Sequence, residues 1–128
     1  MKRADVDVFE KLTGQLDSLH QEMSVLARKS PNDAVNAFKL RFLNAALKRC
    51  NEFFGEKYRP FSDLDLFPED QLPSNSDVTF IISQYIECAE KFRADNIEHS
   101  IGKVWYWKTE DSGEKVRTAP PRKIEPKK

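Results

Sequence analysis

Residues 9–26, FEKLTGQLDSLHQEMSVL, carry an apolar side chain at every third or fourth position. Successive members of this series are separated by 3, 4, 3, 4 and 3 residues, and they are Phe9, Leu12, Leu16, Leu19, Met23 and Leu26. The spacing is typical of a helix with a narrow heptad seam. We therefore predict a helix from about Asp5 to Lys29 that forms one member of a bundle or half of a dimer interface.

A second helix is expected almost directly after the first. The stretch RKSPNDAV, residues 28–35, places two bases in the last turn of the first helix, where they suit the helix dipole. Ser30 then fits the N-cap of the next helix, with Pro31 at its first position. This second helix is predicted to run to about Phe54, with Gly55 as its stop signal. So short a connection implies an antiparallel hairpin or a sharp corner.

Two apolar series run along this second helix. One series consists of Val35, Phe38, Phe42 and Ala45. The other consists of Leu40, Leu43, Leu47, Cys50 and Phe54. A helix with two apolar faces is expected to be covered on both sides, so we place it at the centre of the fold.

A third helix is predicted to begin near Ser74 or Ser76 and to end near Asn96 or Ile97. The stretch SNSD offers a capping pattern, and the apolar residues that follow it are Val78, Ile81, Ile82, Tyr85, Ala89 and Phe92. Four glycines in 128 residues argue against a turn-rich β protein, and the length suits one domain. The sequence therefore predicts an all-α, three-helix antiparallel bundle over residues 1–101.

The segment between the second and third helices is long and acidic. It reads RPFSDLDLFPEDQLPSNSD over residues 59–77. In one interpretation its apolar side chains fold down over the bundle, with a turn of helix among them: Phe61, Leu64, Leu66, Phe67 and Leu72. In the other, a protein partner binds an exposed docking sequence made of Phe61, Leu64, Asp65, Leu66 and Phe67.

The C-terminal extension, residues 102–128, differs in character from the helical part. KVWYWKTEDSGEKVRTA reads as two short β-like runs around a hairpin turn, and APPRKIEPKK after it is expected to be extended or disordered. Interleaved bases and aromatics can stack on unpaired nucleotides while neutralising phosphate. The candidate contacts are Lys103, Trp105, Tyr106, Trp107, Lys108, Arg117, Arg122 and Lys123. Against this interpretation, tryptophan in a helical domain usually anchors the core.

No residue pattern points to catalysis, to a metal or to a cofactor. His20 and His99 lack the spacing of zinc ligands, and the four glycines are isolated rather than grouped in a phosphate loop. Cys50 lies within an apolar helix face, where its thiol is expected to be inert. We predict a protein that is not an enzyme.

Charge and cysteine content bear on partners and location. Residues 1–57 carry ten bases and eight acids, residues 58–98 three and nine, and residues 99–128 eight and four. An acidic middle and a basic tail can attract each other within or between chains. Cys50 and Cys88 have no CxxC spacing, and a disulfide between them requires the two helices to bring them together. Without a signal-peptide pattern or an apolar run of membrane length, the sequence predicts a cytoplasmic protein with no membrane contact.

These features predict a non-enzymatic helical module for protein–protein interaction, with a regulatory or assembly role. Three apolar helix faces exceed what one short chain is expected to cover, so we predict a homodimer formed through the seam of the first helix, and an unidentified protein partner. The alternative is a nucleic-acid-binding accessory protein that uses the aromatic and basic C-terminal segment.

Overall fold

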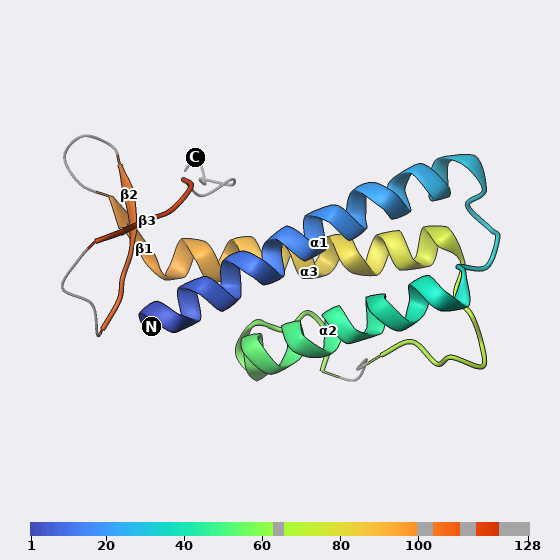
Figure 1. Ribbon diagram of the computed structural model, residues 1–128, viewed down its shortest axis with the longest axis horizontal. Coiled ribbons are helices and arrows are strands. Elements are labelled where there is room, and N and C mark those ends of the chain that lie inside the picture. The colour runs from blue at the N-terminus through green and yellow to red at the C-terminus, as the bar shows by residue number, and fades with distance from the viewer. Residues whose placement is uncertain (63–65, 100–103, 111–114, 121–128) are drawn as a thin grey trace, which may run out of the picture.

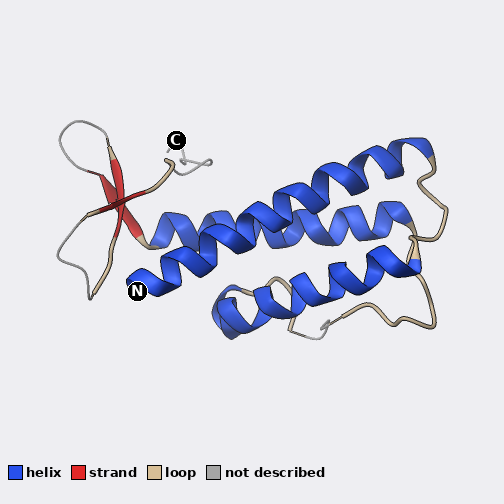
Figure 2. Cartoon of the chain, viewed as in Figure 1, coloured by secondary structure: helices blue, strands red, loops and turns tan. Residues whose placement is uncertain are grey.

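The computed structural model describes residues 1–62, 66–99, 104–110 and 115–120. This part of the chain contains three helices and three short strands (Figures 1 and 2). In chain order they are α1 (Arg3–Lys29), α2 (Ala37–Tyr58), α3 (Asn75–Asp95), β1 (Ile97–His99), β2 (Trp105–Trp107) and β3 (Val116–Arg117). The predicted three helices are confirmed, and the all-α description has to be widened by a small antiparallel sheet.

The helices α2 and α3 run parallel to each other, and both run antiparallel to α1 (Figure 1). Just before the two helices begin, the Val35 N–H donates to the Pro73 carbonyl at 2.8 Å, and at their far ends the Tyr58 hydroxyl donates to Asp95 at 2.7 Å. The prediction of an antiparallel bundle is therefore wrong for this pair. Helix α2 has 22 residues and is about 33 Å long, a length that the 16 residues between Tyr58 and Asn75 are sufficient to span.

Helix α2 begins six residues later than predicted. Its first residue is Ala37, and the Asn36 side chain accepts a hydrogen bond from the Lys39 N–H as the N-cap. The backbone of residues 31–35 is held instead by the start of α3, since Asn75 N–H donates to the Asp33 carbonyl at 2.9 Å. At the other end, Gly55 has a φ of +66° and interrupts the helix, as its position as a stop signal predicted.

The seam of α1 faces the core of the single chain. Four of its residues are buried, namely Phe9, Leu12, Leu16 and Met23, while Leu19 and Leu26 are half-buried. Their neighbours in the core come from α3 and α2, among them Val78, Ile82, Tyr85, Leu40 and Leu47. Each fully buried apolar side chain contributes about 1.5–3 kcal/mol. Within the single chain α2 and α3 therefore already cover this seam, which leaves it little free surface for self-association.

The sheet has the order β1–β2–β3 with antiparallel pairing throughout. The predicted hairpin is confirmed as β2 and β3, and β1, which follows α3 directly, was not predicted. Trp107 on β2 is only 2% exposed and meets Phe9 edge to face at 5.2 Å. The sheet thus packs on the bundle at the N-terminal end of α1 (Figure 1). The division of the chain at residue 101 stays a prediction.

The acidic segment is anchored to α2 through one residue. Phe67 is buried, and its backbone N–H and carbonyl both bond to the side-chain amide of Asn44, at 2.9 Å each. Leu66 and Leu72 are exposed, and residues 69–70 form a turn rather than the predicted turn of helix. The anchoring interpretation is therefore confirmed for Phe67 alone. Leu64 and the neighbouring Asp65 lie outside the described residues.

Candidate interaction surface

Two phenylalanines of α2 are exposed to solvent near the start of the helix. Phe38 is 62% exposed and Phe42, one turn later, is 56% exposed. Their rings meet edge to face with centroids 5.0 Å apart. The prediction that α2 is covered on both sides is therefore wrong for Phe38 and Phe42, although Val35 of the same series is buried. Leu40, Leu43 and Leu47 of the other series are buried as expected.

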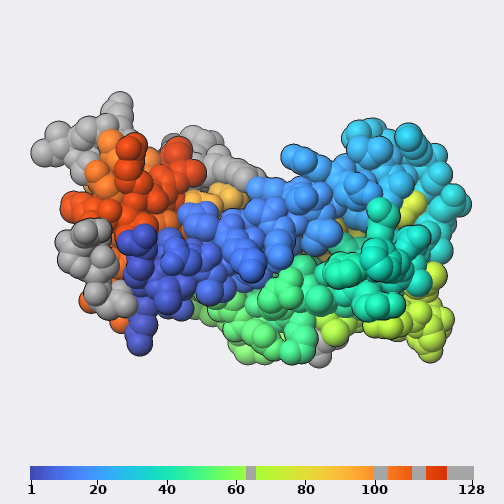
Figure 3. Space-filling model, in the orientation of Figure 1, coloured from blue at the N-terminus to red at the C-terminus, as the bar shows by residue number. Residues whose placement is uncertain are grey.

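The exposed rings border a groove between α1 and α2. Two hollows adjoin there, with volumes of about 130 and 190 Å³, and Leu19 and Phe42 line both of them. Figure 3 views the face on which α1 (blue) and α2 (teal to green) lie side by side. We call this surface the α1–α2 groove and define its apolar lining as Leu19, Met23, Phe38, Phe42, Leu43 and Ala46. A groove of this kind is suited to receiving apolar side chains of another molecule.

Two basic side chains of α2, Lys39 and Arg49, line the groove. Residues 37–51 include four bases and no acid: Lys39, Arg41, Lys48 and Arg49. Lys39 pairs with Glu22 of α1 at 2.6 Å, and the hydrogen bond and charge of Lys39 lower the pKa of Glu22. Arg49 donates to the neutral side chain of Gln15 at 3.1 Å. The charged residues that line the two hollows are Lys39, Arg49 and Glu22, two bases against one acid, so the groove carries one net positive charge although the whole chain is neutral.

Two of these bases, Lys39 and Arg41, also lower the local stability of α2. The first turn of the helix contains no acidic residue, and Lys39 and Arg41 lie near its positive dipole end. A base in that position is unfavourable by about 0.3–1 kcal/mol. Residues that oppose local stability without an evident structural gain are expected at functional sites.

The predicted docking sequence in the acidic segment lies beside a different depression. Leu66 and Gly55 line a wide hollow of about 490 Å³ whose remaining walls are polar or charged, namely Lys48, Asn51, Glu52, Glu56 and Arg59. Phe61 is half-buried, and Phe67 is held in the core as described above. The three predicted docking residues that the structure describes, Phe61, Leu66 and Phe67, therefore do not form one exposed apolar surface.

The predicted nucleic-acid contacts are divided between the two faces of the sheet. Trp107 is buried, and half-buried Trp105 lies against the His99 ring at 4.7 Å, so these indoles face protein. Tyr106 points to the other face, where it is directly opposite Arg117 and the Lys115 ammonium lies 5.1 Å from its ring centre. Lys108 is exposed. The remaining candidates, Lys103, Arg122 and Lys123, lie outside the described residues.

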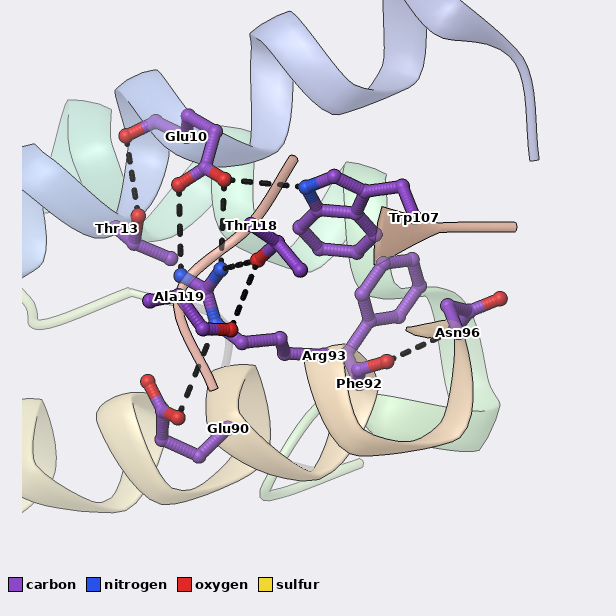
Figure 4. A network of polar contacts seen from close by, with 9 residues as sticks. All are labelled: Glu10, Thr13, Glu90, Phe92, Arg93, Asn96, Trp107, Thr118 and Ala119. Carbon is purple, nitrogen blue, oxygen red and sulfur yellow. Dashed lines mark hydrogen bonds and ion pairs between the residues drawn. The ribbon is translucent and has the colours of Figure 1, made fainter. Parts of the chain in front are cut away.

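A buried arginine joins α1, α3 and the sheet (Figure 4). Arg93 is 6% exposed, and its guanidinium lies 5.2 Å from the Phe9 ring and 5.4 Å from the Trp107 ring. It bonds to both carboxylate oxygens of Glu10 at 3.4 Å and to the Thr118 hydroxyl. Trp107 Nε1 also donates to Glu10 at 3.3 Å. The arginine fastens the sheet to the helices.

Arg93 was not singled out from the sequence, although a signal for it exists. Counting from Val78 and Ile82, the core-facing stripe of α3 continues through Tyr85 and Ala89 to position 93 at helical spacing. A base that occupies a position of an apolar stripe is expected to be buried with partners.

The titratable groups give no sign of a catalytic or metal centre in the described part of the chain. No group of three or more His, Cys, Asp or Glu side chains is placed there to hold a metal ion. Both cysteines are free, and burial raises the pKa of Cys50 to about 12. None of the described helices combines the length and the apolar character required to cross a bilayer.

Searches with protein-family models, among curated proteins and among solved structures gave no match to this chain.

Proposed function

We propose that the chain is a non-enzymatic protein-interaction module whose binding surface is the α1–α2 groove. The observation that carries the proposal is the exposure of Phe38 and Phe42 beside two adjoining hollows. Exposed aromatic side chains next to a concave surface are typical anchors of protein interfaces.

A regulatory or assembly role agrees with this surface, because binding there requires no chemistry of the chain itself. Self-association remains part of the proposal, with the groove in place of the α1 seam. A second copy and an unrelated protein are its two possible occupants. The cytoplasm is the compartment that we propose, since Cys50 and Cys88 are both free.

Photo-crosslinking in the cells that naturally make the protein tests this proposal. A benzophenone amino acid at position 42 is expected to form a protein adduct, and Phe38→Ser is expected to suppress it. The matched control is the same amino acid at position 80, since Phe80 is 59% exposed on α3. An adduct of twice the chain mass of 14.9 kDa identifies a second copy, and any other mass identifies another protein. Equal adducts at both positions, or none at position 42, would refute the proposal.

A second candidate function is binding of single-stranded nucleic acid on the outer face of the sheet. The observation that favours it is the placement of Tyr106 between Lys115 and Arg117. A ring flanked by bases can stack on a nucleotide while the bases neutralise phosphate.

Mobility shifts with single-stranded RNA and DNA test this second function at low and moderate salt. Tyr106→Ala together with Arg117→Glu is expected to abolish the shift, and added salt is expected to weaken it strongly. If the double variant binds as well as the original chain, this face is not a nucleic-acid site.

A further inference from the structure

We infer that the α1–α2 groove receives an acidic amphipathic helix of a partner protein. The inference rests on the proposed function and adds to it the shape and charge of the occupant.

The arrangement of the hollows suits a helix. One hollow is bordered by Phe38 and Phe42, and the other by Phe42 and Ala46, so the two follow successive turns of α2. Positions 38 and 46 are separated by two turns, or about 12 Å along the helix axis. An incoming helix presents side chains i, i+4 and i+7 at the same interval. Two neighbouring apolar side chains of such a helix would therefore each reach one hollow.

The charge around the groove suits an acidic helix. Lys39 forms an ion pair with Glu22, but this pair is solvent-exposed and contributes little to stability. Arg49 is bonded to a neutral amide, and Arg41 is exposed. A helix with acidic residues beside its apolar stripe would meet Lys39 and Arg49, which line the hollows, and would relieve the unfavourable position of Lys39 in the first turn of α2.

Charge also disfavours the second copy as occupant. A symmetric dimer that pairs α2 with its mate brings residues 37–51 of two chains together, and this stretch carries only bases among its charged residues. Like charges across an interface are destabilising. An anionic membrane would satisfy the bases, but the apolar lining is concave between two helices, whereas insertion into lipid favours a protruding apolar face.

Two synthetic peptides of matched shape test the inference. Each has about 20 residues with leucines at positions i, i+4, i+7 and i+11, and the remaining positions are glutamate in one peptide and lysine in the other. Fluorescence anisotropy with the full chain measures both. We expect the acidic peptide to bind about tenfold or more tightly than the basic one, and added salt to weaken its binding.

Variants of the chain locate the binding site of the acidic peptide. Lys39→Glu with Arg49→Glu, which changes the two bases that line the groove, is expected to reverse the preference between the peptides. Phe38→Ser with Phe42→Ser is expected to abolish binding, whereas Phe80→Ser, which changes an equally exposed ring on α3, should leave it unchanged.

Four outcomes would overturn the inference. Equal binding of both peptides, with Phe42 still required, removes the acidic specificity and leaves the proposed function intact. If neither peptide binds while position 42 still crosslinks to a protein in cells, an acidic amphipathic helix is excluded as the occupant and the proposed function stays intact. Light scattering that shows a dimer dependent on Phe38 and Phe42 assigns the groove to a second copy. Binding of phosphatidylserine vesicles through the same two rings, tighter than binding of the acidic peptide, assigns it to a membrane.

Discussion

Two clusters of aromatic rings in this molecule have similar distances between ring centroids but different surroundings. The first lies in the core, where Phe9 contacts Phe53, Phe92 and Trp107 at centroid distances of 5.9, 5.1 and 5.2 Å. The second is the pair Phe38 and Phe42, whose centroids are 5.0 Å apart in water. The rings of the first cluster come from α1, α2, α3 and β2, whereas both rings of the second come from one helix.

The difference shows which part of an aromatic contact stabilises a fold. The contact between two aromatic rings contributes about 0.5–1.5 kcal/mol to stability beyond the effect of burial, and both clusters gain this contribution. Removal of a ring from water contributes about 1.5–3 kcal/mol, and only the first cluster gains it in full. Because Phe38 and Phe42 are more than half exposed, most of this free energy would be gained only when a binding partner covers the two rings. Substitutions in and beside the two clusters test this distinction between a stabilising cluster and a binding cluster.

The largest effect is expected from Phe9→Ala in the core cluster. The variant should lose about 3–5 kcal/mol of unfolding free energy, because Phe9 is 0% exposed and its ring contacts three others. Urea denaturation followed by circular dichroism measures the loss. Phe80→Ala is the control and should stay within about 0.5 kcal/mol of the original chain. A loss below about 1 kcal/mol for Phe9→Ala would contradict the core assignment.

A smaller effect is expected from Arg93→Met at the polar edge of the same cluster. The methionine keeps the apolar stem but leaves the half-exposed Glu10 and the Thr118 hydroxyl without their cationic partner, so the loss should be about 1.5–3 kcal/mol. Tryptophan fluorescence should shift to the red as the sheet loosens around Trp107. Lys91→Met, which removes an exposed ion pair with Asp95 on the same helix, should cost less than about 0.5 kcal/mol. Equal losses in the two variants would rule out a special role for the buried arginine.

A third effect concerns the core thiol and depends on pH. Burial raises the pKa of Cys50 from 9.0 to about 12, so the folded chain holds this proton at pH values where the unfolded chain has lost it. Stability should therefore fall as pH rises above 9, by about 1 kcal/mol between about pH 8 and about pH 9.5. Burial, together with the hydrogen bond to Asp95, raises the pKa of Tyr58 to about 12, and this group adds to the fall only above its usual value of 10.0.

The control for the pH dependence is Cys50→Ala, which removes the titrating thiol. Denaturation midpoints of this variant should change less between the two pH values than those of the original chain. Cys88 remains in the variant, and its pKa is also raised by burial and by the charge of Glu87, so a shallower slope is expected to persist. A slope that does not change on removal of Cys50 would place its thiol in contact with solvent.

The sequence alone predicted those elements of the fold that are determined by interactions between residues close together in the chain. The seam predicted α1, the Ser74 cap predicted the start of α3, and the turn residues predicted the hairpin of β2 and β3. Each of these signals lies within a few residues of the element it specifies, so no distant contact is needed to interpret it.

Distant contacts explain the parts that were not predicted. Ser30 and Pro31 form a valid helix start, but Asn75, which is more than forty residues later, bonds to the Ser30 carbonyl and to Asp33 and holds the backbone in another conformation. The three residues of β1 carry no strand pattern and acquire their conformation from pairing with β2.

The candidate groove depended on information that hydrophobic periodicity does not contain. The series with Phe38 and Phe42 and the series with Leu40 and Leu43 have the same helical character in the sequence. Periodicity identifies an apolar face, whereas its coverage depends on how many helices the chain can supply. With α1 and α3 both packed on the second series, no helix of the described chain is left for the first.

The smallest effect on stability is expected from Phe42→Ser, and this variant separates the two clusters most directly. The ring is more than half exposed and contacts only Phe38 among the aromatic residues of the described chain, so the unfolding free energy should change by no more than about 0.5 kcal/mol. The same substitution should abolish binding of the acidic peptide. It should also abolish the protein adduct when the benzophenone amino acid is placed at position 38 instead of position 42. Thermal denaturation and anisotropy on one preparation measure both quantities. A variant that loses stability as Phe9→Ala does, yet still binds, would show that the exposed pair supports the fold and that the partner binds elsewhere.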